Sequence, residues 1–191
     1  MESPMETSCP VCGDEKSLKM IAHSTQIAYF GEHTQITLTC DNCGLRQTDF
    51  IPAEGKIPGV WTLELLTIDD PSSLERINAR VVRGSNCTIE IPELELAVYP
   101  GTHSSGYVSN VEGVLNRFKD AINITKNQFT SEESEDIKKC GDLLDTLNSI
   151  INCTNNIGFT LIFSDPMGHS KILHDEAKFR ELTKEEIEDL L

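Results

Sequence analysis

The chain has 191 residues, enough for one full domain or for a small module followed by a medium-sized domain. Its 16 Lys and Arg residues against 31 Asp and Glu residues give a formal net charge of −15 and a pI near 4.6. Because nucleic-acid affinity comes largely from Lys and Arg that neutralise phosphates, this charge argues against a nucleic-acid-binding role and favours a basic protein partner or simply solubility.

The hydropathy of the chain predicts a cytoplasmic protein. No stretch approaches the roughly 20 apolar residues that a membrane helix needs, and the N-terminal residues lack the pattern of a signal peptide. In the cytoplasm thiols stay reduced, so closely spaced cysteines are more often metal ligands than disulfides.

Four of the seven cysteines form two C-x-x-C pairs, Cys9 with Cys12 and Cys40 with Cys43, and each pair is followed by a glycine. Two such turns can present four thiolates to one tetrahedral metal ion, the arrangement of a closed structural zinc site. Redox chemistry is the alternative, but it uses a single C-x-x-C at the start of a helix. We therefore predict that these four cysteines bind one structural Zn²⁺.

The residues around the cysteine pairs predict a zinc ribbon over residues 1–56. Strands are expected at 26–30 and 35–39, joined by a turn at 31–33, with a third strand at 45–50. Residues 1–56 hold four basic and eight acidic side chains, a net charge of −4, which again argues against nucleic-acid binding.

The remainder, residues 57–191, predicts a second domain rich in strands. Strands are expected at 60–68 and 79–83, and across 87–100 apolar and acidic residues alternate as in one half-buried strand jogged at Pro92. Further strands are expected at 159–163 and 170–174.

A helical hairpin is predicted at about 109–153, between the two groups of strands. Ser109 and Glu112 have the spacing of a capping box, and a second helix is expected from about residue 131. A short charged helix is expected at 183–191. A hairpin inserted between strand groups predicts an α+β, mainly β, domain around an antiparallel sheet or barrel. The apolar stripes of the two helices are Val111, Val114, Leu115, Phe118 and Ile122, then Ile137, Cys140, Leu144, Leu147 and Ile151.

Residues with catalytic chemistry form no specific pattern. Cys87, Cys140 and Cys153 occur singly and are expected to behave as small apolar side chains. The five histidines lack metal-ligand spacing, although His169 and His174 are close in sequence. The chain also lacks a phosphate-binding loop and a nucleophile elbow. We therefore do not expect an enzyme.

Several stretches together resemble the ZPR-type zinc-finger protein family. These are the four-cysteine finger, "RVVR", "IPELEL", the helix entry "VEG" and the turn "SDPMGHS", and they cover nearly the whole chain. The chain carries one finger and one β domain, as in single-module archaeal relatives. The resemblance implies a double-stranded β-helix domain, with an inserted helical hairpin, after the finger.

The resemblance also implies a function: binding translation elongation factor 1-alpha and assisting its folding or maturation, here as a monomer. The alternatives are a nucleic-acid-binding zinc ribbon of the transcription or translation apparatus and, for each candidate contact, a role in the fold alone. Arg80 and Arg83 could pair with nearby glutamates, and Asp165 could form a tight turn. The candidate partner contacts are Tyr29, Phe30, His33, Arg80, Arg83 and Asp165.

Overall fold

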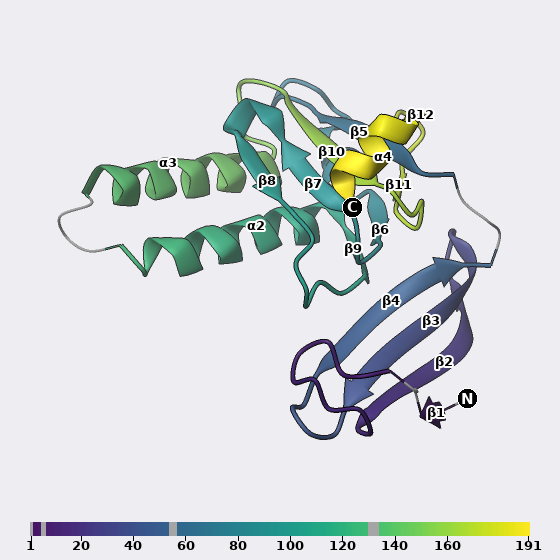
Figure 1. The fold of residues 1–191 in the computed structure, drawn as a ribbon. Coiled ribbons are helices and arrows are strands. Elements are labelled where there is room, and N and C mark those ends of the chain that lie inside the picture. Colours follow the sequence, from purple (N-terminus) through teal and green to yellow (C-terminus); the bar gives the residue numbers. More distant parts are fainter. Residues whose placement is uncertain (1, 5–6, 54–56, 130–133) are drawn as a thin grey trace.

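The computed structural model describes residues 2–4, 7–53, 57–129 and 134–191, which form two β-rich bodies (Figure 1). The N-terminal body, here called the ribbon, is a four-stranded antiparallel sheet with the strand order β1-β2-β3-β4. Its strands are β1 (Glu2–Pro4), β2 (Leu18–Ile27), β3 (Gly31–Cys40) and β4 (Arg46–Pro52).

The turn between β2 and β3 lies earlier than the sequence predicts. Strand β2 ends at Ile27, and β3 already begins at Gly31. The amide of Phe30 donates to the carbonyl of Ile27 at 2.9 Å, and Gly31 adopts a φ of +85° that glycine accepts without strain. The turn therefore occupies residues 28–30, and the predictions of a strand at 26–30 and of a turn at 31–33 are wrong at this end.

The C-terminal body, here called the β domain, contains two antiparallel sheets with a common core. Their strand orders are β12-β5-β10-β7-β8 and β11-β6-β9. This arrangement confirms the predicted α+β, mainly β, class. The strands are β5 (Gly59–Leu65), β6 (Arg80–Arg83), β7 (Thr88–Ile91), β8 (Leu96–Val98), β9 (Tyr107–Asn110), β10 (Phe159–Asp165), β11 (Lys171–Leu173) and β12 (Lys178–Glu181).

The segment predicted as one jogged strand across 87–100 is instead a hairpin. A 3₁₀ turn, η1 (Pro92–Leu94), reverses the chain, so that Ile91 of β7 pairs with Leu96 of β8. Glu95 completes the reversal with a φ of +51°. Proline lacks the amide that a central strand would need, so the chain turns at Pro92 rather than continuing.

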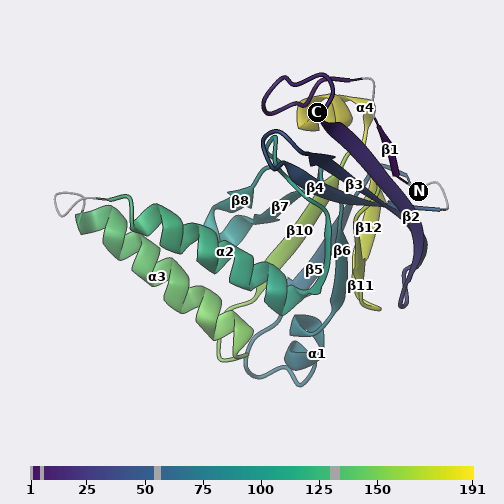
Figure 2. The same cartoon turned by 90° about the horizontal axis from the view of Figure 1, so that it is seen from below.

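The predicted helical hairpin is present as α2 (Val111–Lys126) and α3 (Ser134–Ile151), which lie side by side and extend away from the strands (Figures 1 and 2). The cap of α2 differs from the prediction. Asn110 is the N-cap and accepts from the amide of Gly113 at 2.9 Å, because Ser109 still pairs with Val81 in the sheet. The predicted start of the second helix, at about 131, lies outside the described residues.

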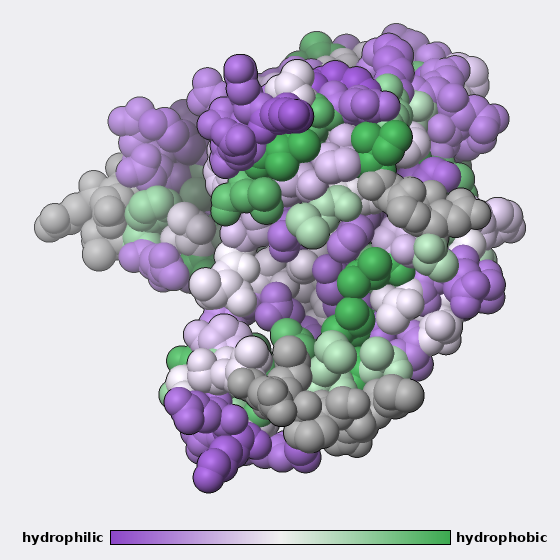
Figure 3. Space-filling view, turned by 45° about the vertical axis from the view of Figure 1, so that its right-hand side comes forward, coloured by the Kyte–Doolittle hydropathy of each residue, from purple (hydrophilic) through white to green (hydrophobic). Residues whose placement is uncertain are grey.

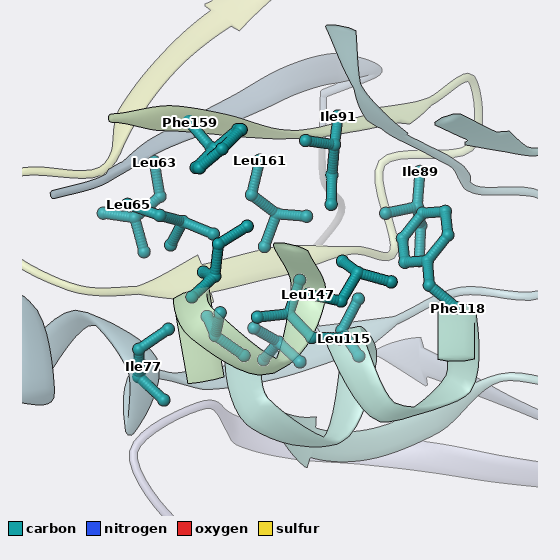
Figure 4. Packing of buried hydrophobic residues seen from close by; sticks show 14 of the residues in the cluster. Leu63, Leu65, Ile77, Ile89, Ile91, Leu115, Phe118, Leu147, Phe159 and Leu161 are labelled. Atoms are coloured by element: carbon teal, nitrogen blue, oxygen red, sulfur yellow. The ribbon is translucent and has the colours of Figure 1, made fainter. Parts of the chain in front are cut away.

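The main core forms where the hairpin covers the sheet. Figure 4 shows Leu63, Leu161 and Ile91 of the strands facing Leu115 of α2 and Leu147 of α3. Two shorter helices, α1 (Ser73–Ile77) and α4 (Lys184–Leu190), complete the fold, the second with the capping box Thr183–Glu186. None of the described helices has the length and apolarity needed to cross a membrane.

Candidate functional site

The four predicted metal ligands meet at one end of the ribbon. The sulfurs of Cys9 and Cys43 lie 3.7 Å apart, as do those of Cys12 and Cys40, and all four lie within 4.8 Å of one another. Tetrahedral zinc with Zn–S bonds of about 2.3 Å would space its sulfurs by roughly 3.8 Å. The four thiols therefore fit a single closed zinc site.

Two similar turns aim these sulfurs inward. In the first, the amide of Gly13 donates to the carbonyl of Cys9 at 2.9 Å, and the amide of Cys9 donates to the carbonyl of Asp14 at 2.8 Å. In the second, the amide of Gly44 donates to the carbonyl of Cys40 at 2.9 Å. Gly13 and Gly44 have φ values of +73° and +75°, which explains the glycine after each pair.

The thiols differ in acidity because their hydrogen bonds, burial and neighbouring sulfurs differ. The backbone amide of Asp14, with further help from the side chain of Asn42, lowers the pKa of Cys12 to about 6. The Leu45 amide acts to lower the pKa of Cys43 too, but desolvation and the neighbouring sulfurs outweigh it and raise that pKa to about 12. A bound divalent cation would stabilise all four thiolates together.

The ribbon docks on the β domain through Asp49 of β4. Its carboxylate accepts from the amide of Ser85 at 3.0 Å and from the hydroxyl of Ser85 at 2.8 Å. Nδ1 of His169 lies 3.7 Å from the same carboxylate, an ion-pair distance that is too long for a hydrogen bond. Asp49 thus connects the ribbon to two loops of the β domain.

Backbone contacts beside Asp49 continue this junction. The amide of Gly106 donates to the carbonyl of Thr48 at 2.7 Å, and the side chain of Gln47 donates to the carbonyl of Ser104 at 2.7 Å. A Cβ on Gly106 would lie only 2.6 Å from a carboxylate oxygen of Asp49. The close approach of the two bodies therefore requires glycine at position 106.

Arg83, a candidate partner contact, is buried behind this junction with an exposed fraction of 5%. Its guanidinium donates to the hydroxyl of Ser104 at 2.7 Å and to the carbonyls of Ser105 at 3.1 Å and Cys87 at 2.7 Å. No glutamate pairs with it among the described residues. Arg83 therefore holds the loop that contacts the ribbon.

Asp165, another candidate contact, forms the tight turn after β10 and is only 1% exposed. Its carboxylate accepts from the amides of Met167 at 2.8 Å and Gly168 at 3.1 Å and from the hydroxyl of Ser170. The same hydroxyl accepts from the amide of Gly84 at 2.8 Å. Asp165 thus ties the turn to the loop that carries Ser85.

The remaining candidates lie around the β2–β3 turn. Tyr29 is 74% exposed and has a φ of +70°, and the guanidinium of Arg80 lies 4.9 Å from its ring centroid. Phe30 is half-buried, and His33 is buried, its Nδ1 3.2 Å from the carbonyl of Gly31. Tyr29, Phe30 and Arg80 are thus accessible to a partner, whereas His33, Arg83 and Asp165 are buried.

Sequence reasoning missed the junction residues Asp49, Ser85, Ser104 and His169. The only signal that pointed near them was the family resemblance, because "RVVRGSN" and "SDPMGHS" both line the junction. Spacing along the chain gives no hint that β4 would meet loops this distant in sequence.

The structure thus defines a class of protein: a four-cysteine zinc ribbon docked on a jelly roll of two sheets. The ZPR1 zinc-finger domain matches residues 3–57 and the ZPR1 jelly-roll domain matches residues 75–189. The chain belongs to the ZPR1 family, which confirms the resemblance seen in its sequence.

Relatives of two kinds are similar to the chain. An uncharacterized ZPR1-like protein of Methanocaldococcus jannaschii is 34% identical over 190 residues, covering 100% of this chain and 91% of the relative. One of Pyrococcus horikoshii is 34% identical over 184 residues, covering 95% and 78%. The zinc finger chaperone zpr1 of Schizosaccharomyces pombe is 27% identical over 173 residues, covering 88% of this chain but only 34% of the longer relative.

Proposed function

We propose that this protein binds translation elongation factor 1-alpha and assists its folding or maturation. The name of the fission-yeast relative, a zinc finger chaperone, supports a chaperone role for a protein built from these domains. Elongation factor 1-alpha binds tRNA and nucleotide and offers basic surface, which suits a partner with a net charge of −15.

The observation that carries the proposal is the conformation of Tyr29. A tyrosine that is 74% exposed and has a φ of +70° is both solvated and strained. Residues in strained conformations persist at binding sites because the surrounding structure holds them there. The guanidinium of Arg80 in the β domain lies 4.9 Å from the centroid of this ring, so both bodies contribute to one exposed aromatic contact.

We further propose that one structural Zn²⁺ folds the ribbon, and that the protein acts in the cytoplasm as a monomer without catalysing a reaction. A site of four thiolates has no open coordination position, so a metal there would stabilise structure rather than bind substrate. Among the described residues, these cysteines form the only cluster suited to hold a metal ion.

Gel filtration tests this proposal directly. The zinc-loaded protein is mixed with the elongation factor 1-alpha of the same organism without nucleotide, with GDP and with GTP. We expect a co-eluting complex that weakens as salt rises, since charge steers the association. Separate elution of the two proteins in all three nucleotide states at low salt would refute the proposal.

A nucleic-acid-binding ribbon is the alternative that the sequence left open. Electrophoretic mobility of labelled tRNA and of single-stranded DNA with the zinc-loaded protein separates the two ideas. Salt-sensitive shifts without a protein complex would favour nucleic-acid binding.

A further inference from the structure

A cavity of about 240 Å³ lies where the ribbon tip meets the β domain. Figure 3 shows apolar surface gathered in the region where the two bodies meet. The cavity belongs to neither body alone, because β3, the segment after β4, β5 and β12 all contribute to its wall. Its apolar lining consists mainly of Phe30, Pro52, Ile57, Trp61, Val82 and Phe179.

Two aromatic rings contribute to the β-domain side of this cavity. Trp61 of β5 and Phe179 of β12 are paired across the strands, with ring centroids 5.0 Å apart and planes at 45°. Phe179 is 43% exposed and Ile57 is 54% exposed, so large apolar side chains face solvent at the opening. Such an opening suits an inserted apolar side chain, because burying it would remove all of these groups from water.

The polar part of the cavity is cationic, although the protein as a whole is acidic. Lys171 is the only Lys, Arg, Asp or Glu among the residues that line it, beside His33 and His169. Its ammonium lies 6.0 Å from the centre of the Trp61 ring and forms no salt bridge with any residue in the described ranges.

A second, more open depression adjoins the first and shares Trp61 and Lys171 with it. Tyr29 and Arg80 lie on its wall, and Arg80 forms no salt bridge within the described part of the chain. Two acids, Glu75 and Asp175, also line this depression, but neither is within ion-pair distance of Arg80 or Lys171. We call the two depressions together the Trp61 groove.

We propose that the Trp61 groove binds an extended segment of the protein partner in which a large apolar side chain stands next to Asp or Glu. The apolar side chain enters the cavity beside Trp61 and Phe179. The carboxylate pairs with Lys171 or, one or two residues further along the segment, with Arg80. This inference rests on the proposed function only in taking the partner to be a protein.

The charges of the groove and of the whole protein favour a peptide over a nucleic acid as the ligand of the Trp61 groove. Aromatic rings beside cations can also stack bases. Yet two cations against Glu75 and Asp175 provide little attraction for a chain of phosphates, and the net charge of −15 opposes it. One carboxylate next to an apolar anchor needs only one cation, which Lys171 supplies.

Trp61 makes the groove directly observable, since it is the only tryptophan in the chain. The zinc-loaded full-length protein is used to select binders from a phage-displayed library of random 12-residue peptides. The enriched peptides are synthesised and titrated while the emission of Trp61 is recorded. We expect enriched sequences to pair Phe, Leu, Ile or Trp with a nearby Asp or Glu, and binding to change the Trp61 emission.

Variants then test the charge and the cavity separately. Lys171→Glu should weaken the selected peptides by roughly tenfold or more, since it replaces attraction by repulsion. The charge-matched control is Lys138→Glu, at an exposed position of α3, which should bind as the wild type does. Phe179→Ala should weaken binding by roughly fivefold or more while retaining a preference for acidic peptides.

Four outcomes overturn the inference. It fails if no peptide is enriched, if the selected peptides lack the apolar–acidic pair, or if Lys171→Glu and Lys138→Glu weaken binding equally. It also fails if single-stranded oligonucleotides, but not the peptides, change the Trp61 emission. If the complex with elongation factor 1-alpha survives Lys171→Glu, the proposed function stands, but the Trp61 groove takes no part in it. If the selected peptides bind as expected but elongation factor 1-alpha does not bind, the groove stands as a peptide-binding site and the proposed function fails.

Discussion

At the scale of single residues, the exposed side chain of Cys12 allows the proposed zinc site to be tested. Cys12→Ser removes one thiolate without disturbing packing, because this side chain is exposed. We expect zinc content to fall well below one ion per chain and the ribbon to unfold, since the free energy of metal binding is what stabilises the folded ribbon. Metal analysis and amide hydrogen exchange measure both effects.

Cys153→Ser, outside the ribbon, is the matched control and should keep its zinc. Full zinc content in Cys12→Ser together with a protected ribbon would show that the site is not the one described.

The buried guanidinium of Arg83 provides a second test. Arg83→Met keeps the length of the side chain but removes three hydrogen bonds, including those that the guanidinium donates to the carbonyls of Cys87 and Ser105. We expect a loss of about 2–4 kcal/mol in the free energy of unfolding, measured by urea denaturation. Arg80→Met, at an exposed position, should change stability by less than about 0.5 kcal/mol. Equal losses in the two variants would contradict the structural role assigned to Arg83.

The stability of the junction between the ribbon and the β domain depends on pH through His169 and Asp49. The Asp49 carboxylate raises the pKa of His169 above its ordinary 6.5, so this contribution to stability is full below pH 6.5 and is lost as pH rises through the raised value. Burial acts to raise the pKa of Asp49, but His169 and Ser85 outweigh it and hold this pKa below 3.8. The contribution of Asp49 is present above pH 3.8 and is lost as pH falls through the lowered value.

NMR titration of the His169 ring measures the effect. We expect a pKa above 6.5 in the wild type and a fall in Asp49→Asn. The same pKa in both proteins would show that Asp49 does not act on His169.

At the scale of elements, the helical hairpin is held by its apolar stripes rather than by its caps. Leu147 of α3 is fully buried against the sheet. Leu147→Ala should therefore cost about 2–5 kcal/mol of stability, from lost burial and the cavity left behind. Ile124 of α2 is 63% exposed, so Ile124→Ala should cost far less in the same denaturation experiment. A small loss for Leu147→Ala would mean that the hairpin packs differently.

Helices were easier to predict from the sequence than strands. The 3.6-residue periodicity of Val111 to Ile122 identified α2 because one face of it is buried. The four residues of β12 are all exposed, so no alternation marked it as a strand. The β7–β8 hairpin was missed because apolar and acidic residues alternate on both sides of Pro92, and the one-residue shift in that alternation fits a jog in one strand as well as it fits a turn.

At the scale of the whole molecule, the clustering of the four cysteines could be predicted but the junction could not. The spacing of the two cysteine pairs, Cys9 with Cys12 and Cys40 with Cys43, is enough to predict that their four sulfurs lie together. Asp49 meets Ser85 and His169 only because the β domain brings two distant loops together, and nothing local in the sequence encodes that contact. The exposed groove at this junction therefore became visible only in the folded protein.

We propose that the ribbon and the β domain form one surface that recognises elongation factor 1-alpha. Isothermal titration calorimetry of that factor with the zinc-loaded chain, at low and at high salt, tests it most directly. We predict binding of one factor per chain that weakens with salt and is lost in Cys12→Ser. Absence of binding by the wild type, or equal binding by Cys12→Ser, would contradict the claim.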